Sequence, residues 1–379
     1  MQAQALEADY LVIGSGAVGM GFIDVLMAES SATVVLVDRH HRPGGHWNDA
    51  YPFVRLHSPA AYYGVSSTPL GSGLVEREGD NAGLLDLASG REIAAYYDRV
   101  LERLLATGRL RYFPMCEYQG GHEFVSRLSG QRVQVAVRKK LIDATFTRTE
   151  VPSTHKPRYT IAAGVRCVPI NDLVKVAQPA AGYVVIGGGK TGIDACLWLL
   201  DSGVALSSIR WIRPRDAWLH NRAHVQPPML GSIMMESAAT QMEEAAHATS
   251  LEDLFLRLEA REELLRIDTG VMPTMFRGAT VSKAELAKLR RIEDVVRLGR
   301  VQRIERDRIV LERGSVPTSV GALHIDCSAD GIALSPDPRP VFEPGRVTVQ
   351  CVRYLHVTLS AALIGHLEAT QPDALARNN

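Results

Sequence analysis

Two glycine-rich segments contain the residues of this sequence that are most readily tied to chemistry. The first segment follows the apolar run 10–13 and has glycines at three spaced positions, Gly14, Gly16 and Gly19. A helical pattern then reaches about residue 29, and a second apolar run, 33–37, ends at Asp38. Asp38 stands nineteen positions beyond Gly19. This order of strand, glycine turn, helix, strand and acidic residue is typical of a dinucleotide-binding βαβ unit.

Each residue of the first segment has a distinct role in such a unit. Gly14 permits the tight turn, Gly16 lets the backbone approach a pyrophosphate, and Gly19 lets the helix pack closely on the strand. The free N–H groups and the dipole of the helix N-terminus then face the phosphates. Asp38 is expected to accept hydrogen bonds from a ribose hydroxyl.

The same pattern returns after the apolar run 183–186. Its cofactor-binding candidates are Gly187, Gly189, Lys190, Thr191 and Gly192. The next apolar run ends at Arg213, twenty-one positions beyond Gly192, in the place that Asp38 holds in the first unit. A guanidinium pairs with a 2′-phosphate, whereas a carboxylate repels it, so the second unit predicts NADP(H). The alternative is that Arg213 is only a solvated strand end.

Composition excludes several classes of protein. The 379 residues include 42 basic and 42 acidic side chains, so net charge gives no case for a nucleic-acid or anionic-membrane partner. No apolar run approaches the length that spans a bilayer, and we expect no signal peptide before the first folded pattern. The five cysteines form no CxxC pair and no zinc spacing. We therefore expect no metal site and a cytoplasmic location.

Several further motifs carry a family resemblance. They are the segment GSGAVGMGF from residue 14, the stretch Gly44-Gly45-His46-Trp47 followed by Tyr51-Pro52 and Leu56-His57-Ser58-Pro59, the runs 141–145 and 325–331, and a tail helix near residues 359–362. With these motifs the chain resembles the flavin-containing monooxygenase superfamily, of the group B type with one FAD domain and one NADPH domain. The resemblance covers most of the chain except roughly residues 222–290.

The resemblance implies FAD and NADPH as cofactors and two nested domains. The fold class predicted is α/β, with two nested Rossmann-like dinucleotide-binding domains of three layers each. Residues 1–148 and 326–379 would form the FAD domain, and 149–163 a linker. Residues 164–325 would form the NADP domain, with a helical insertion at about 222–290.

The resemblance also implies the chemistry and further site residues. The expected activity is monooxygenation of a small organic substrate by dioxygen through a flavin C4a-(hydro)peroxide, in a chain for which a homo-oligomer is possible. Because the cofactor carries this chemistry, no catalytic side chain is assigned. The flavin-lining candidates are His46, Trp47 and His57. The FAD contacts expected besides the first glycine segment are Arg39, Trp47, Cys116 and Ser360.

The sequence departs from the family in two places. The hydroxylation signature, FxGxxxHxxx, should precede the second glycine segment, but residues 151–159 contain His155 without the Phe-x-Gly. Asp330 stands where the family usually has threonine. These departures bear on oxygen transfer rather than on the two cofactor sites. Two alternatives therefore stay open: an FAD- and NAD(P)H-dependent reductase or dehydrogenase without oxygen transfer, and a non-catalytic dinucleotide-binding protein.

Overall fold

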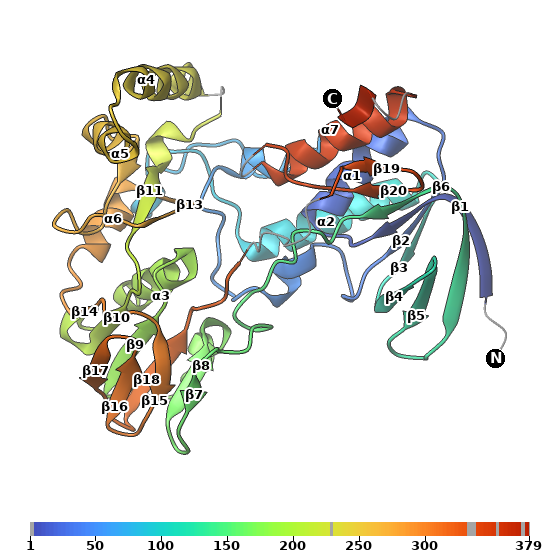
Figure 1. Cartoon of the computed structure of the whole chain (residues 1–379). Coiled ribbons are helices and arrows are strands. Elements are labelled where there is room, and N and C mark those ends of the chain that lie inside the picture. Colours follow the sequence, from blue (N-terminus) through green and yellow to red (C-terminus); the bar gives the residue numbers. More distant parts are fainter. Residues whose placement is uncertain (1–3, 228–229, 332–338, 354–355, 373–375, 379) are drawn as a thin grey trace.

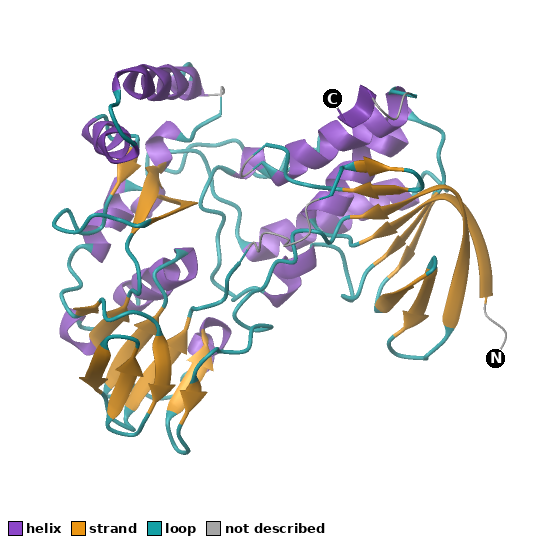
Figure 2. Ribbon diagram, viewed as in Figure 1, coloured by secondary structure: helices purple, strands orange, loops and turns teal. Residues whose placement is uncertain are grey.

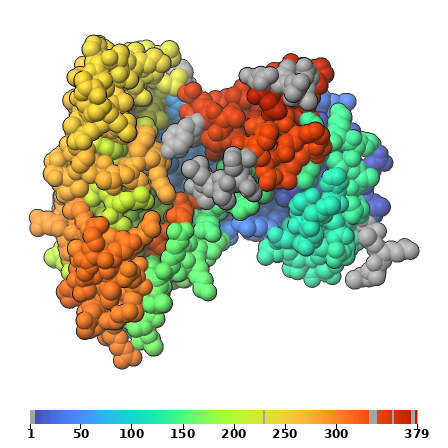
Figure 3. Space-filling view, viewed as in Figure 1, coloured from blue at the N-terminus to red at the C-terminus, as the bar shows by residue number. Residues whose placement is uncertain are grey.

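The computed structural model describes residues 4–227, 230–331, 339–353, 356–372 and 376–378. The chain folds into two lobes, each built on a mainly parallel sheet (Figure 1). In the first lobe the helices lie on the side of the sheet that faces the second lobe (Figure 2). The lobes join across the middle of the molecule, and its surface is hollowed between them below that junction (Figure 3).

The sheet of the first lobe has the order β19-β20-β6-β1-β2-β3. Its strands are β1 (Gln4–Ile13), β2 (Val34–Val37), β3 (Leu110–Phe113), β6 (Arg132–Asp143), β19 (Phe342–Glu343) and β20 (Arg346–Thr348). Pairing is parallel from β3 through β20. All four residues of β2 are buried, as expected for a parallel strand covered on both faces. Strands β4 (Cys116–Gly120) and β5 (Glu123–Ser126) add an antiparallel extension to β6.

The sheet of the second lobe has the order β14-β10-β9-β18-β8, and its strands pair in parallel throughout. They are β8 (Arg166–Pro169), β9 (Gly182–Ile186), β10 (Ile209–Ile212), β14 (Val295–Val296) and β18 (Ala322–Asp326). A smaller sheet joins β7 (Thr160–Ile161), β15 (Val301–Ile304), β16 (Arg308–Leu311) and β17 (Gly314–Pro317). The predicted α/β class with two Rossmann-like units is confirmed.

Segment 222–290 is only partly helical, so the prediction of a helical insertion covers only part of it. Its helices are α4 (Ile233–His247), α5 (Leu251–Ala260) and α6 (Lys283–Leu289), and its strands are β12 (Leu264–Leu265) and β13 (Met275–Val281). Strand β13 pairs in parallel with β11 (Ala217–Asn221), which lies outside the predicted insertion. Helical periodicity could not reveal β13, because the strand character of this segment depends on its pairing partner.

The helices of the first lobe are α1 (Ala17–Glu29), α2 (Gly90–Leu105) and α7 (Val357–Thr370), and the second lobe has α3 (Lys190–Asp201) after its glycine turn. A capping box starts α2, because the Ser89 hydroxyl accepts from the Glu92 N–H and the Glu92 carboxylate accepts from the Ser89 N–H. Within the described ranges, no helix combines the length and the apolarity needed to cross a bilayer.

Helix α7, near the C-terminal end of the chain, packs directly on α1. A Cβ atom on Gly365 would lie 2.8 Å from the carbonyl oxygen of Phe22, and one on Gly21 would lie 3.2 Å from that of Thr358. These backbones approach so closely because both glycines lack a side chain. The C-terminal segment is thereby fixed against the helix that follows the first glycine turn.

We predict that Gly365→Val lowers the free energy of unfolding by about 1–3 kcal/mol, because the added atoms push α7 away from α1. Urea denaturation checks this. Leu363→Val, on the exposed face of the same helix, controls for the introduction of valine into α7. Valine has a higher helix propensity than glycine, so propensity alone cannot lower the stability at position 365. Equal losses in the two variants would contradict the proposed close packing.

Candidate functional site

The first glycine turn joins β1 to α1 with almost no space between the two elements. Gly14 has φ +98°, and its N–H donates to the carbonyl of Val37 at 2.9 Å. A Cβ atom on Gly19 would lie 1.9 Å from the carbonyl oxygen of Gly14. Any side chain at position 19 would therefore force the helix off the strand, which is the role the sequence predicts for this glycine.

A second glycine loop faces this turn. Gly45 has φ +56°, and a Cβ atom on it would lie 3.0 Å from the Cα of Gly16. The N–H of Gly44 donates to the carbonyl of Ser15 at 2.9 Å, which holds the two loops together. Gly16 caps α1 without a side-chain hydrogen bond, and no acidic residue lies in the first turn of the helix. Bare backbone and a helix N-terminus thus meet here, as an anion-binding site requires.

Asp38 lies at the end of β2 and is buried. Its Oδ2 accepts from the N–H of Ser15 at 2.5 Å and from the Ser15 hydroxyl at 2.8 Å. Its Oδ1 accepts from the N–H of His40 at 2.7 Å and lies 2.9 Å from His40 Nδ1. Burial alone would raise the pKa of Asp38, but these hydrogen bonds from His40 and Ser15 outweigh it and hold the pKa below its ordinary value.

The other predicted FAD contacts lie around the same strand ends or on α7. Arg39 is exposed, and its carbonyl accepts from Arg127 at 3.1 Å. Cys116 begins β4, and its N–H donates to the carbonyl of Asp38 at 2.9 Å, while burial raises the pKa of its thiol. Ser360 is buried near the start of α7, where its hydroxyl donates to the carbonyl of His356 at 2.8 Å. The Ser360 hydroxyl is therefore already engaged within the helix.

The second glycine turn repeats the geometry of the first. Gly187 has φ +136°, and its N–H donates to the carbonyl of Ile212 at 3.0 Å. A Cβ atom on Gly192 would lie 2.1 Å from the carbonyl oxygen of Gly187. A Cβ atom on Gly189 would meet nothing within 4 Å, so the turn is open there. Lys190 and Thr191 form the first turn of α3, which has no acidic residue.

Arg213 follows β10 and is only 2% exposed, so the alternative of a solvated strand end is wrong. Its guanidinium lies over the ring of Trp211 at 4.7 Å, and its Nη2 lies 3.0 Å from Asp216 Oδ1. Its Nε and Nη1 are buried and have no hydrogen-bond partner among the described residues. Burial lowers the pKa of this guanidinium from its ordinary value. Nε and Nη1 of Arg213 can therefore each still donate a hydrogen bond to an acceptor.

Two flavin-lining candidates lie on a 3-10 helix, η1 (Gly45–Asp49), that begins at the second glycine loop. Trp47 donates from Nε1 to the Tyr63 hydroxyl at 2.7 Å. The ring of His46 lies 5.1 Å from that of Trp47, and burial lowers the pKa of His46 to about 4. His46 is therefore neutral near pH 7.

His57 reaches from the first lobe to the second. Its Nδ1 lies 3.1 Å from the N–H of Thr280 on β13, which can only donate, so the proton of this imidazole is on Nε2. Burial, assisted by the positive charges of Lys190 and Arg222, lowers the pKa of His57 to about 3. His57 thus offers a neutral Nε2–H donor near the second glycine turn.

Two contacts between the lobes were not identified from the sequence. Arg222 is fully buried, donates to the carbonyl of His57 at 3.0 Å and pairs with Glu285 at 2.7 Å. The hydroxyl of Tyr51 donates to Asp194 on α3 at 2.5 Å, and the same carboxylate binds Lys190. A single arginine or tyrosine forms no sequence motif that would predict its partner, so these pairs are seen only in the folded structure.

The chain crosses between the lobes through two similar turns. Asp143 accepts from the N–H of Thr145 at 3.0 Å, and Asp326 accepts from the N–H of Ser328 at 3.2 Å. His155 lies beside the second crossover, with Nε2 3.4 Å from the Ser328 hydroxyl. Asp330, the departure from the family, pairs with Arg158.

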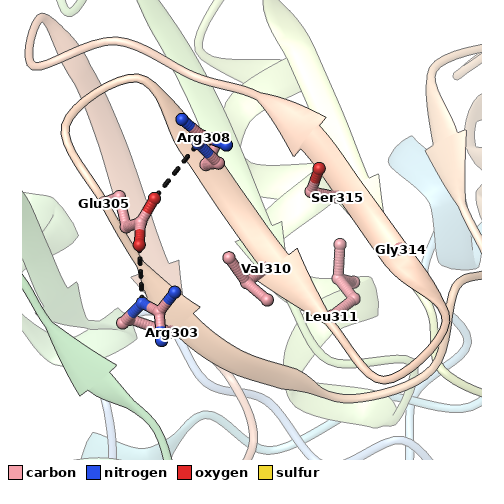
Figure 4. Close-up of a pocket in the computed structure, with 7 residues that line it drawn as sticks. All are labelled: Arg303, Glu305, Arg308, Val310, Leu311, Gly314 and Ser315. Atoms are coloured by element: carbon pink, nitrogen blue, oxygen red, sulfur yellow. Dashed lines mark hydrogen bonds and ion pairs between the residues drawn. The ribbon is translucent and has the colours of Figure 1, made fainter.

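A groove of about 510 Å³ lies on the smaller sheet of the second lobe and is lined by residues of β15, β16 and β17 (Figure 4). None of its lining residues belongs to either glycine turn. The cationic side chains of Arg303 and Arg308 both bind Glu305, at 2.7 and 3.1 Å. Because no residue of either glycine turn lines it, this groove is not part of the candidate site.

Comparison with curated proteins gives close relatives. The uncharacterized proteins Rv2000 of Mycobacterium tuberculosis and Mb2023 of Mycobacterium bovis are each 50% identical over 378 residues, which is 99% of this chain and 70% of theirs. This chain belongs to their family. No protein-family model matches the sequence.

Solved structures with a similar fold include flavin-containing and steroid monooxygenases. A flavin-containing monooxygenase from Stenotrophomonas maltophilia matches with a TM-score of 0.51 and 16% identity over 97% of this chain and 98% of its own. OTEMO in complex with FAD and NADP gives 0.59 and 11%, over 97% and 85%. A steroid monooxygenase bound to NADP gives 0.57 and 14%, over 96% and 84%. This member of the mycobacterial family therefore has the fold that the sequence resemblance implies.

We predict that Tyr51→Phe lowers the free energy of unfolding by about 1–3 kcal/mol, because the partly buried Asp194 carboxylate loses a donor. Equilibrium urea denaturation measures this. Tyr62→Phe is the matched control, since among the described residues its hydroxyl bonds only to the sulfur of Met234, at 3.4 Å, and little change is expected. Equal effects in both variants would show that the Tyr51–Asp194 contact contributes nothing particular.

Proposed function

We propose that this protein is an FAD-dependent, NADPH-using monooxygenase of a small organic substrate. One observation carries the proposal. Two strand–glycine-turn–helix units of the same geometry lie in separate lobes, and residues near both turns touch across the junction. Two dinucleotide sites in one chain favour a flavin and a nicotinamide that exchange hydride over a dehydrogenase with one site.

The first glycine turn fits FAD. The backbones of Gly16 and Gly45 face each other closely, and α1 presents an uncapped N-terminus with no acidic residue in its first turn. These groups would hold the pyrophosphate, and Asp38 stands at the ribose position. Trp47 and the neutral His46, which follow Gly45 on η1, would line the flavin.

The second glycine turn fits NADPH. Gly189 is open toward solvent, and the first turn of α3 carries Lys190 and no acid. Arg213 follows the next strand with two unpaired donors, Nε and Nη1, which suit a 2′-phosphate. A ligand oxygen there would satisfy donors that otherwise carry a desolvation cost.

We further propose the division of the chain that the sequence predicts, with residues 1–148 and 326–379 as the FAD domain and 164–325 as the NADP domain. Strand β20 extends the first sheet beside β6, and α7 packs on α1, which supports the assignment of the C-terminal segment. Strand β18 lies in the second sheet and ends at Asp326, where the crossover begins.

When bound, FAD would accept a hydride from NADPH and supply the redox chemistry toward dioxygen. The chain's own residues would bind, orient and exclude water. His57 would donate from Nε2 to a ligand acceptor near Lys190, and it stays neutral because its pKa is about 3. The expected partners are a small organic molecule and dioxygen, in a cytoplasmic enzyme.

A reductase or dehydrogenase without oxygen transfer is the second candidate. The hydroxylation signature is absent from residues 151–159. That segment has one histidine, His155, and its Nε2 lies 3.4 Å from the Ser328 hydroxyl. The same two cofactor sites serve either activity, so only the fate of oxygen separates them.

The decisive experiment follows flavin and oxygen together. FAD is added to the purified protein, NADPH is added without air, and the mixture then receives ¹⁸O₂ with thioanisole or cyclohexanone. Flavin bleaching followed by ¹⁸O in a sulfoxide or lactone would support the monooxygenase. Bleaching with all oxygen recovered as hydrogen peroxide would favour the reductase, and failure to bind FAD would overturn both.

We predict that Arg213→Ala raises the KM for NADPH at least about tenfold and leaves the KM for NADH nearly unchanged, because only NADPH carries the 2′-phosphate. Steady-state kinetics with both nucleotides measure this. Arg210→Ala is the matched control, because Arg210 lies on β10, which Arg213 follows, and is paired with Asp294 at 2.9 Å. Equal changes with NADPH and NADH would refute the role of Arg213.

A further inference from the structure

His40 lies between two carboxylates at the first glycine turn. Its Nδ1 is 2.9 Å from Asp38 Oδ1, and its Nε2 is 2.8 Å from Asp49 Oδ2. The His40 side chain is 13% exposed, that of Asp38 4% and that of Asp49 27%, so the three groups are largely shielded from water. Such short, shielded contacts are sensitive to the positions of the protons.

Only the protonated form of His40 satisfies this geometry. A neutral imidazole has one N–H donor and one lone pair, so one of its nitrogens would face a carboxylate oxygen without a proton between them. An imidazolium donates from both nitrogens and also balances part of the charge of the two carboxylates. The contacts themselves therefore identify His40 as a cation in this arrangement.

The two carboxylates belong to opposite walls of the first site. Asp38 is fixed to the glycine turn through the N–H and hydroxyl of Ser15. Asp49 ends η1, the helix that starts at Gly45, whose backbone faces Gly16. By bridging Asp38 and Asp49, His40 holds the two glycine loops at a fixed separation.

The bridge also reaches the second lobe. The carbonyl of Asp49 accepts from the hydroxyl of Ser153 at 2.5 Å and from the side-chain amide of Asn171 at 3.0 Å. Ser153 lies in the predicted linker and Asn171 follows β8 of the second sheet. Movement of Asp49 would therefore disturb the junction of the lobes as well as the two facing glycine loops.

We propose that His40 is a positioning residue that, in its protonated form, clamps Asp38 to Asp49. The clamp fixes the nucleotide cradle, by which we mean the two facing glycine loops at Gly16 and Gly45. Retention of the nucleotide therefore depends on pH. The proposal rests on the proposed FAD site for the identity of that nucleotide. The clamp itself rests only on this chain's residues.

The groups that face His40 come from three elements. Asp38 faces it from β2, Asp49 and His46 from η1, and Tyr112 on β3 lies near Asp38, with its hydroxyl 3.4 Å from that of Ser15. The hydrogen bond to Asp38 chiefly, and that to Asp49, raise the pKa of His40, although burial opposes them. The pKa of His46 is about 4, and burial raises that of Tyr112 beyond the physiological range.

The direction of the pH dependence follows from this shift. A histidine whose pKa is raised in the folded state stabilises that state below its ordinary pKa, and the contribution disappears as pH rises through the raised value. The cradle should therefore be best fixed in mildly acidic solution. Loss of the imidazolium leaves one of the two carboxylates without a donor from the imidazole ring.

The test measures the Kd for FAD, by quenching of flavin fluorescence, and the Tm of the protein without FAD, both from about pH 6 to about pH 9.5. Wild type is compared with His40→Gln, Asp49→Asn and the control His41→Gln, whose imidazole is exposed beside the clamp. In Asp49→Asn, a neutral imidazole donates to Asp38 from Nδ1 and accepts from the introduced amide at Nε2, so no proton is needed.

We expect the wild-type Kd to rise about tenfold across this range, the value of one charge-assisted hydrogen bond. His41→Gln should follow wild type. His40→Gln should bind weakly at every pH, and Asp49→Asn should stay tight with a flat profile. The Tm without FAD should fall with pH in the wild type more steeply than in either His40→Gln or Asp49→Asn.

A flat wild-type profile, or the wild-type slope in His40→Gln, would overturn the proposal. If FAD does not bind at any pH, the proposed function fails and with it the link to a nucleotide. The Tm profiles then still decide whether the clamp exists, because they need no ligand. Equal Tm slopes in wild type and Asp49→Asn would exclude it.

Discussion

The close backbone approach at the two glycine turns is the constraint on which the rest of the structure depends. In each lobe the helix after the turn lies so near the strand before it that a Cβ atom would overlap a carbonyl oxygen, at 1.9 Å for Gly19 and 2.1 Å for Gly192. No relaxation of a side chain relieves such an overlap, because the atom in the way is backbone. The helix N-termini are therefore aimed at fixed points just beyond the parallel strands.

The elements around each turn extend this constraint outward. Helix α7 packs on α1 through Gly21 and Gly365, and thereby brings the C-terminal segment to the first lobe. Between the lobes, the fully buried Arg222 binds the carbonyl of His57 and the carboxylate of Glu285, so all its partners are internal. Removing one partner from such a buried charge is costly, so the junction favours one arrangement of the lobes.

The sequence predicts those features that depend on neighbouring residues in the chain. The glycine turns, the helices after them and the buried strands follow from short patterns, and the structure contains them. Strand β13 could not be predicted, because its strand character comes from pairing with β11. The burial of Arg213 against Trp211 could not be predicted either, since a strand end is exposed or covered according to what packs over it. The bridge from Asp38 through His40 to Asp49 needs a folded loop to bring Asp49 back to the strand end.

The polar groups at both turns are engaged before any ligand arrives, and this decides how a ligand would bind. Asp38 receives hydrogen bonds from Ser15 and His40, and Lys190 is paired with Asp194. A nucleotide would therefore exchange partners at these groups rather than satisfy bare charges, and the net gain from each exchange is small. Arg213 differs, because its Nε and Nη1 lack partners. An acceptor placed there gains hydrogen bonds without breaking any, so discrimination between two nucleotides is expected to be strongest at Arg213.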